Sequence, residues 1–244
     1  MPKEPSFRFG ADKTYTAPDI APETPFWAIG DVHGRYDLLA PLLDQLMKRD
    51  EQIVLLGDYI NKGPNSAAVL KLLKEATATG RVVALRGNHE ELLLRYLVRP
   101  RVLTDTFLGY GGLATLHSFG VNCTPPVLDL RRMSRIRNGL RAALGDLERW
   151  ISTLPFQFHS GNVTALHAGA DPALPMDRQH APSFCWGHPR FTKEPRADGR
   201  WIIHGHGPVD AVTVKQRRVA IDTCANECGP LSAILVDKGR LTML

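Results

Sequence analysis

The feature that most constrains this chain is a short apolar run that ends in Gly-Asp, which occurs twice between Phe26 and Asp58. The first copy reads Trp27-Ala-Ile-Gly-Asp-Val-His-Gly, and the second reads Ile53-Val-Leu-Leu-Gly-Asp. An apolar run of this length, bounded by Gly, is typical of a buried strand. The Asp and His that follow would then lie just past the carboxyl end of the strand, where open α/β sheets bind their ligands.

The same pattern returns in three later segments of the chain. They read Val82-Val-Ala-Leu-Arg-Gly-Asn-His-Glu, Val163-Thr-Ala-Leu-His-Ala-Gly and Trp201-Ile-Ile-His-Gly-His. A single His or Asp of this kind is more often a satisfied polar residue in a turn. At five successive strand ends, however, Asp, His and Asn form the donor set of a metal site, which is what the sequence predicts.

Helical patterns connect the first three predicted strands, at residues 26–29, 53–56 and 82–85. Apolar residues recur at helical spacing over 36–48 and again from Val69 to Leu73, and Gly80 closes the second helix. Strands that alternate with helices indicate a parallel sheet. From Val163 onward only short strands are expected, at 163–166, 201–203, 212–214, 219–221 and 231–236, which favours a mixed or antiparallel sheet. We therefore predict an α/β fold of two packed sheets with helices outside.

Two segments depart from the strand pattern. Residues 1–24 are rich in Pro and charge and show no periodicity, so we expect a flexible N-terminal tail before a single domain at 25–244. Residues 91–154 are expected to form a helical insertion near the site, interrupted at Gly111-Gly112. Five arginines between Arg131 and Arg141 indicate a solvated helix face, or else a lid that attracts anionic substrate.

Composition limits the possible partners. The 244 residues carry a formal net charge of +5, which suits an anionic substrate and is weak evidence for nucleic acid. No run approaches the roughly 18 apolar residues of a membrane span. The N-terminus has no apolar signal-peptide core, so we expect a cytoplasmic protein without a membrane partner.

The four cysteines are too few and too scattered for a disulfide framework. Cys185 with His188, together with Cys224 and Cys228, would offer four zinc ligands, but reduced core residues are the commoner use of such cysteines.

Three blocks of this sequence resemble the signature of the calcineurin-like metallophosphoesterases. They are Gly30-Asp-Val-His-Gly, Gly57-Asp-Tyr-Ile-Asn-Lys-Gly and Gly87-Asn-His-Glu. His167-Ala-Gly and His204-Gly-His-Gly-Pro resemble the later histidine motifs of the family. The resemblance spans about residues 26–236 and is closest to the bacterial branch of the phosphoprotein (serine/threonine) phosphatases. It implies a sandwich of two packed mixed β-sheets flanked by helices.

The resemblance also implies a site with two divalent metal ions. The first metal would be held by Asp31 and His33, the second by Asn88, His167 and His206, and Asp58 would bridge them. A hydroxide shared by the metals would attack phosphorus, and His89 would be the general acid for the leaving oxygen. Mn²⁺ is the expected working metal, and Fe or Zn also suits these ligands. We leave His204 out, because its side chain should alternate away from that of His206.

The second block departs from the family pattern, which has Asp-Arg where this chain has Asn61-Lys62. Asn61 can still hydrogen-bond to the catalytic His89 but brings no charge. Lys62 would bind substrate phosphate as a mobile point charge. Asn88 and an Arg near Trp186 are the other phosphate contacts that the family implies. Arg190 is the candidate for that Arg, and His188 is the alternative.

The predicted function is a dinuclear-metal-dependent phosphoesterase that acts on a phosphorylated protein or a nucleotide. We rank a serine/threonine protein phosphatase first and a dinucleoside tetraphosphatase second, since Asn61 also resembles the latter enzymes. The rival from another class is a catalytically weak, metal-bound phosphate-binding protein, for which the Asn61-Lys62 pair would be the mark. A nucleic-acid partner has the weakest support, because it depends on net charge and the arginine cluster alone.

Overall fold

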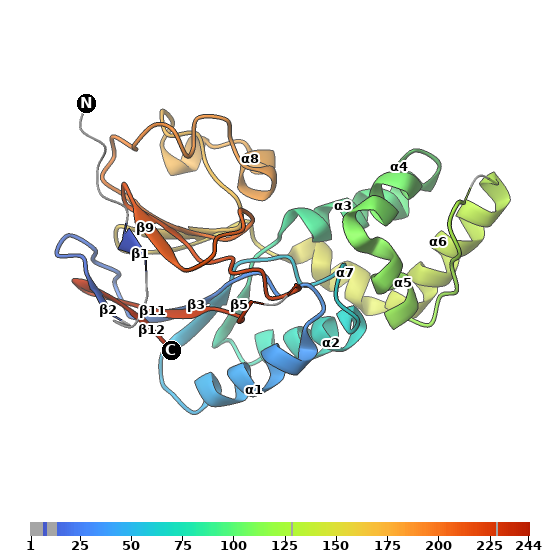
Figure 1. Cartoon of the computed structure of the whole chain (residues 1–244), viewed down its shortest axis with the longest axis horizontal. Coiled ribbons are helices and arrows are strands. Elements are labelled where there is room, and N and C mark those ends of the chain that lie inside the picture. Colours follow the sequence, from blue (N-terminus) through green and yellow to red (C-terminus); the bar gives the residue numbers. More distant parts are fainter. Residues whose placement is uncertain (1–6, 9–13, 128, 228) are drawn as a thin grey trace.

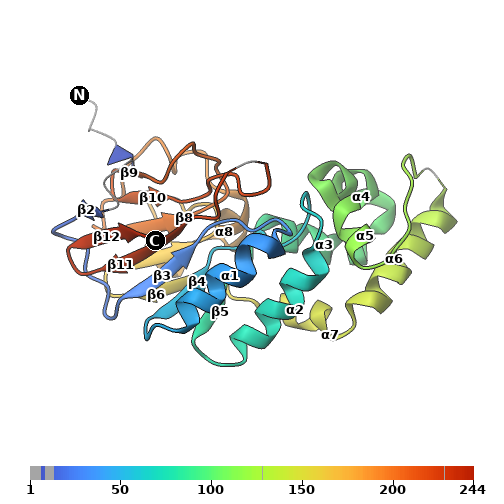
Figure 2. The ribbon, with the colours of Figure 1, turned by 60° about the horizontal axis from the view of Figure 1, so that its bottom comes forward.

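The computed structural model describes residues 7–8, 14–127, 129–227 and 229–244. Within these residues the strands form two six-stranded sheets that face each other (Figures 1 and 2). One sheet has the order β1 (Phe7–Arg8), β9 (Thr213–Lys215), β10 (Arg218–Ala220), β8 (Trp201–His204), β7 (Val163–Leu166), β6 (Gln157–Ser160). The other has the order β2 (Thr14–Thr16), β12 (Arg240–Met243), β11 (Ala233–Asp237), β3 (Phe26–Ile29), β4 (Gln52–Leu55), β5 (Val82–Ala84).

The predicted parallel unit is confirmed in β3, β4 and β5, which pair in parallel. Helices α1 (Tyr36–Met47) and α2 (Ser66–Thr77) make the crossovers and cover the outer face of this sheet (Figure 2). Side chains alternate along β3: Trp27 and Ile29 join the core beneath the helices, while Phe26 and Ala28 join the core between the sheets. A strand with apolar residues on both faces must be buried on both, which is why these runs show no alternation in the sequence.

The second sheet is mixed, as predicted. β8 pairs in parallel with both β7 and β10, whereas β6 and β9 pair antiparallel with their neighbours. A short 3₁₀ turn (Met176–Arg178) and α8 (Ala181–Trp186) lie on the outer side of this sheet. Strands β6 and β12 were missed in the sequence, because each is a four-residue segment with polar and apolar residues intermixed.

The predicted insertion is a group of helices that projects from one end of the sandwich (Figure 1). Its elements are α3 (Asn88–Val98), α4 (Pro100–Phe107), a π-helical turn (Leu108–Gly112), α5 (Leu113–Ser118), α6 (Leu130–Leu144) and α7 (Asp146–Thr153). The expected break at Gly111-Gly112 is present, with Gly111 at φ 83°. None of the helices described is long and apolar enough to cross a membrane.

The described part of residues 1–24 differs from the flexible tail that we predicted. Strand β2 pairs with β12, and Phe7–Arg8 pairs with β9, so each sheet gains an edge strand from this segment. Ala17 and Ile20 are buried between the sheets. Edge strands gain only one neighbour each, and this short polar segment carries no pattern that would have revealed its pairing.

Candidate dinuclear metal centre

The predicted site residues follow five strands whose carboxyl ends meet at one end of the sandwich. Asp31 follows β3, Asp58 follows β4, and Asn88 begins α3 just after β5. From the other sheet, His167 follows β7 and His206 follows β8. The side chains of Asp31, Asp58, Asn88 and His167 are almost completely buried. The sequence prediction that these strand ends converge is therefore correct in its geometry.

The backbone at this site is strained in several places. Five non-glycine residues of the cluster have positive φ angles: His33 (44°), Asp58 (55°), Asn61 (69°), Lys62 (62°) and His206 (62°). Such conformations cost on the order of 1–3 kcal/mol each and persist only where the surrounding structure holds them. Their concentration here is typical of a functional site.

Two groups of side chains can each hold a cation. One contains His33, Asp58 and His89, and the other contains Asp58, His167 and His206. Within each group the ligand atoms lie within 4.8 Å of one another. The carboxylate of Asp58 is common to both, which is the position that a bridging ligand requires. His89 belongs to the first group, where the family resemblance had placed Asp31.

Asn88 completes the second group. Its Oδ1 lies 2.8 Å from Nε2 of His167 and 2.9 Å from Nδ1 of His206. His167 Nε2 is in turn 3.4 Å from Oδ1 of Asp58. These atoms all carry lone pairs, and a cation placed among them would be bound by every one. His167 Nδ1 lies 3.0 Å from the backbone oxygen of Leu56, which leaves Nε2 unprotonated and ready for a metal.

Asp31 lies in the same buried cluster without belonging to either group. Its carboxylate accepts hydrogen bonds from the backbone N–H of His206 at 3.2 and 3.3 Å. Burial, then the carboxylates of Asp222 and Asp58, raise the pKa of Asp31 well above its ordinary value. Three carboxylates this close need cations to remain charged together. Asp222 is a residue of the site that sequence reasoning missed.

The imidazoles are held neutral, which is the form that binds metals. Burial lowers the pKa of His33 to about 4, against the opposing effect of Asp58. Burial likewise lowers the pKa values of His167 and His206. Burial alone would raise the pKa of Asp58, but the imidazoles of His167, His89 and His33 hold it below its ordinary value. Neutral imidazoles around an ionised carboxylate fit two divalent cations.

His89 is oriented by a hydrogen-bond network that reaches the helical insertion. The Nδ2 group of Asn61 donates to Nδ1 of His89 at 2.8 Å, as the sequence predicted for an Asn at this position. The amide is held by Thr115 of α5, whose hydroxyl donates to Oδ1 of Asn61 at 2.7 Å. With Nδ1 as acceptor, the proton of the neutral ring lies on Nε2, which lies 3.6 Å from Oδ2 of Asp58. Thr115 had no sequence signal that linked it to the site.

Glu90 supports the centre from beneath. Its carboxylate accepts backbone N–H groups of Asp58 (2.9 Å), Tyr59 (2.8 Å) and Gly87 (3.0 Å). Burial and the nearby Asp58 raise the pKa of Glu90 to about 8. This side chain fastens the start of α3 to the loop after β4, which explains the Glu at the end of the third block.

A cavity of about 430 Å³ opens above the centre. Lys62 lines it, with Nζ 3.2 Å from Nε2 of His33. Tyr110, from the π-helical turn, lies edge-on to His89 with ring centroids 5.6 Å apart. The opposite wall includes Asn226 and Glu227 of the loop before β11. The helical insertion thus covers the site through the turn that carries Tyr110, a residue the sequence had not indicated.

Arg190 does not line this cavity, so its predicted contact with phosphate is not supported. Its guanidinium donates to both carboxylate oxygens of Asp171 at 2.7 and 2.9 Å. Gly187, at φ 81°, ends α8 and changes the direction of the chain after Trp186, an effect that spacing alone could not predict. His188, the alternative, lines a neighbouring hollow of about 520 Å³ that shares His206 with the catalytic cavity.

Two other sequence hypotheses are not supported by the structure. The arginines of α6 do not line the catalytic cavity: Arg131 and Arg135 border a separate hollow, and Arg137 and Arg141 donate to the backbone oxygen of Leu97. The zinc site also fails in its described residues, none of whose cysteines belongs to a metal-holding group. Burial raises the pKa of Cys185 to about 12, so it is a thiol, and Cys228 lies outside the described residues.

The fold and the site define a class of protein, the metal-dependent phosphoesterases with two packed sheets. The family model described as calcineurin-like phosphoesterase matches residues 24–210, and the chain belongs to this family. The protein is a metal-dependent phosphoric ester hydrolase, as the sequence predicted.

Relatives of known name are similar over different lengths. An asymmetrical bis(5′-nucleosyl)-tetraphosphatase PrpE of Bacillus velezensis is 28% identical over 223 residues, which cover 80% of this chain and 82% of that protein. Serine/threonine-protein phosphatase 2 of Escherichia coli is 39% identical, but only over 70 residues, 28% of this chain and 30% of that protein.

Solved structures confirm the fold. A structure assigned as a diadenosine tetraphosphatase has a TM-score of 0.62 at 22% identity, covering 94% of this chain and 98% of the other. The cold-active protein-tyrosine phosphatase of a psychrophilic Shewanella has a TM-score of 0.57 at 18% identity, covering 91% of this chain and 79% of the other.

Proposed function

We propose that this protein hydrolyses dinucleoside polyphosphates at the centre around Asp58. The observation that carries the proposal is the pair of hollows that meet at His206. The catalytic cavity extends from His206 toward Tyr110, and the second hollow extends toward Trp186 and Phe191. A substrate with two bulky ends joined by a phosphate chain would place its chain at the metal centre and one end in each hollow.

The walls of both hollows suit nucleobases. Tyr110 and Trp186 approach edge to face, with ring centroids 6.1 Å apart, and they stand between the two spaces. Aromatic rings bind a planar base by stacking, and such contacts do not depend strongly on which base it is. The full-length similarity to tetraphosphatases supports the same choice. Sequence alone ranks protein phosphatase first; these two observations lead us to propose the other order.

Several side chains have clear tasks in this proposal. Bound at the two groups that share Asp58, divalent metals would supply an activated water and neutralise phosphoryl charge. Lys62 would bind a phosphoryl oxygen, and Nε2 of His89 would give its proton to the departing oxygen. Asn61 holds His89 in place for that transfer. We propose Mn²⁺ as the working metal, because imidazole, carboxylate and amide ligands suit it. A cytoplasmic location stays a prediction.

A serine/threonine protein phosphatase is the second candidate. It is supported by the local similarity to phosphatase 2 of Escherichia coli, which is higher in identity but much shorter. The sequence Arg86-Gly-Asn-His-Glu also resembles the protein-phosphatase form. The two candidates share the same metal chemistry and differ in what the walls of the cavity bind.

The test compares kcat/KM of the Mn²⁺-loaded protein for diadenosine tetraphosphate, a phosphoserine peptide and an aryl phosphate. We expect the dinucleotide to be preferred, and we expect Tyr110→Leu to lower its kcat/KM about tenfold while leaving the aryl phosphate nearly unchanged. Tyr36→Leu is the matched control, because the two tyrosines have similar exposure, 39% and 41%, and Tyr36 lies at the start of α1. Preference for the peptide, with no effect of Tyr110→Leu on the dinucleotide, would replace this proposal with the second candidate.

A further inference from the structure

A second concave site lies at the opposite end of strand β8 from the metal centre. This hollow, which we call the basic pocket, has a volume of about 540 Å³, within the usual range for small-ligand sites. Its chemistry is carried by Tyr15, Arg196, Arg200, Trp201, Lys215 and Arg217. Trp201 begins β8 and His204 ends it. At roughly 3.3 Å per residue, the pocket is about 10 Å from the metal centre along the strand. The two cavities share no residue.

The floor of the basic pocket holds an unsatisfied donor. The side chain of Trp201 is only 4% exposed, yet its indole N–H has no hydrogen-bond partner among the described residues. Other tryptophans of this chain are satisfied: Trp27 donates to Glu51 and Trp150 donates to Thr77. Buried polar groups in proteins nearly always have partners. A ligand that offers an oxygen atom to the pocket would supply the partner of Trp201.

The charges around the pocket have one sign. All four charged residues that line it are basic. Arg196 is paired with Asp198, and Arg217 is paired with Asp19 at 2.5 Å. Arg200 donates only to the backbone oxygen of Gly161 and the hydroxyl of Thr164. Neither Arg200 nor the exposed Lys215 has a carboxylate partner in the described part of the chain. Two positive charges therefore remain uncompensated beside the donor.

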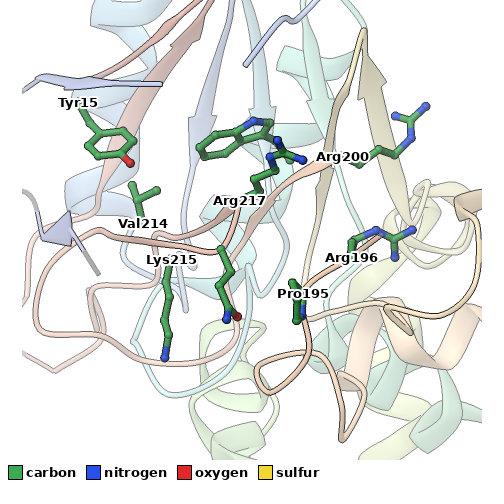
Figure 3. Close-up of a pocket in the computed structure, with 9 residues that line it drawn as sticks. Tyr15, Pro195, Arg196, Arg200, Val214, Lys215 and Arg217 are labelled. Carbon is green, nitrogen blue, oxygen red and sulfur yellow. The ribbon is translucent and has the colours of Figure 1, made fainter. Parts of the chain in front are cut away.

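The pocket is also built by segments far apart in the sequence. Tyr15 comes from β2, Trp201 from β8, and Lys215 and Arg217 from the turn between β9 and β10 (Figure 3). In that figure Tyr15 and Lys215 lie on one side of the hollow and Arg196 and Arg200 on the other, with Arg217 between them. Tyr15 and Trp201 add aromatic surface to the polar lining.

We propose that the basic pocket binds the phosphoryl group of a small ligand, at a site separate from the metal centre. A phosphate monoester carries a charge of about −1.5 to −2 and three strong acceptor oxygens. The pocket offers a matching excess of positive charge, the ammonium of Lys215, the guanidinium of Arg217 and the indole N–H of Trp201. The aromatic surface of Tyr15 would contact a ring when the phosphoryl group belongs to a nucleotide. The site does not depend on what the metal centre hydrolyses.

The test follows the indole N–H resonances of the Zn²⁺-loaded full-length protein by two-dimensional NMR. The resonance of Trp201 is assigned by its loss in Trp201→Phe. The two probes are inorganic phosphate and the phosphonate analogue of AMP, whose P–C bond a phosphoesterase does not cleave. Trp186 lines the hollow beside the metal centre, so its resonance reports binding there and Trp201 reports binding in the basic pocket.

We expect the Trp201 resonance to shift saturably, with a Kd on the order of 1 mM or below. Lys215→Gln and Arg217→Gln should each raise that Kd about tenfold, the usual loss for a hydrogen bond to a charged group. Arg149→Gln, which removes an exposed charge on α7, should leave it unchanged. Equal binding of both probes would identify the phosphoryl group alone as the ligand, and tighter binding of the analogue would add the ring. Both results support the site.

Two results would overturn the proposal. One is a Trp201 resonance that stays fixed while that of Trp186 moves. The other is a shift that sodium chloride reproduces at equal ionic strength, or that Lys215→Gln and Arg217→Gln leave unaltered. Neither result bears on the metal centre, because hydrolysis is measured separately and the residues of the two sites are distinct.

Discussion

Thr115→Val isolates the part that the helical insertion plays in catalysis. Thr115 is fully buried, and its hydroxyl makes two contacts with Asn61. It accepts the backbone N–H of Asn61 at 2.9 Å and donates to the side-chain Oδ1 at 2.7 Å. Valine has nearly the shape of threonine, so the substitution removes the hydroxyl with little change in packing. The backbone N–H keeps a second acceptor, Oγ of Ser66 at 3.1 Å, whereas Oδ1 of Asn61 loses its donor.

The magnitude follows from that count. One buried acceptor without a partner costs about 1–3 kcal/mol, so the free energy of unfolding should fall by that amount. Oδ1 also fixes which end of the Asn61 amide faces Nδ1 of His89. If about 1.4 kcal/mol of this order is lost at the transition state, kcat falls about tenfold. KM for a small aryl phosphate should change little, because Thr115 does not line the cavity.

The assay pairs aryl phosphate hydrolysis in Mn²⁺ with urea unfolding of the same variants. Thr104→Val is the matched control: Thr104 is buried on α4 and its hydroxyl donates to the backbone oxygen of Pro100 at 2.7 Å, away from the site. It should lose stability and retain kcat. Thr115→Ser keeps the hydroxyl and should restore most of the rate. Thr115→Val with lowered stability and wild-type kcat would refute the idea that the insertion positions His89 through Asn61.

Four further outcomes are expected. Asp58→Asn should reduce Mn²⁺ binding below the two equivalents expected of the wild type and abolish hydrolysis, since its carboxylate is shared by both ligand groups; retained stoichiometry by elemental analysis would contradict this. Asn61→Asp combined with Lys62→Arg should raise aryl phosphate turnover if the native pair blunts a phosphatase, whereas an unchanged or lower rate would show a pair tuned to its own substrate. Glu90→Gln should lower the free energy of unfolding by about 1–3 kcal/mol, because an amide offers one acceptor oxygen where three N–H groups need two, and an unchanged urea midpoint would reject that account. Burial and the neighbouring Arg200 lower the pKa of His159, so the stability it contributes is present above about pH 6.5 and lost as the pH falls below it; His159→Gln should flatten the stability profile there by less than about 1 kcal/mol, and identical urea profiles would contradict the argument.

The sequence predicted the metal centre well because its pattern and its chemistry coincide. An apolar run followed by Asp, Asn or His marks a strand end, and parallel strands bring their carboxyl ends to the same edge of a sheet. Asp58, Asn88 and His167 could therefore be placed together without any knowledge of long-range contacts. Exclusion of His204 rested on the same alternation: its ring packs against Phe191, with centroids 5.0 Å apart, and lies in neither ligand group.

The remainder of the site depends on contacts that no local pattern records. Tyr110 and Thr115 reach the centre from a turn and a helix that follow no buried strand, and Asp222 follows a three-residue strand of mixed character. Arg190 failed for the opposite reason. Its predicted role relied on a fixed offset from Trp186, and one glycine with positive φ after α8 was enough to send the chain elsewhere.

Specificity and chemistry are consequently encoded in different parts of this chain. Ligands of the metal centre come from strand ends, where the two sheets fix their positions and a substitution would disturb the core. The walls that face the substrate come from the insertion and from the loop that carries Asn226, neither of which the sheets constrain. Loops held on a rigid scaffold can change without loss of the fold. Relatives with the same centre can therefore act on proteins or on nucleotides, and the residues that decide between them here are Tyr110 and Trp186, not the ligands of Asp58's centre.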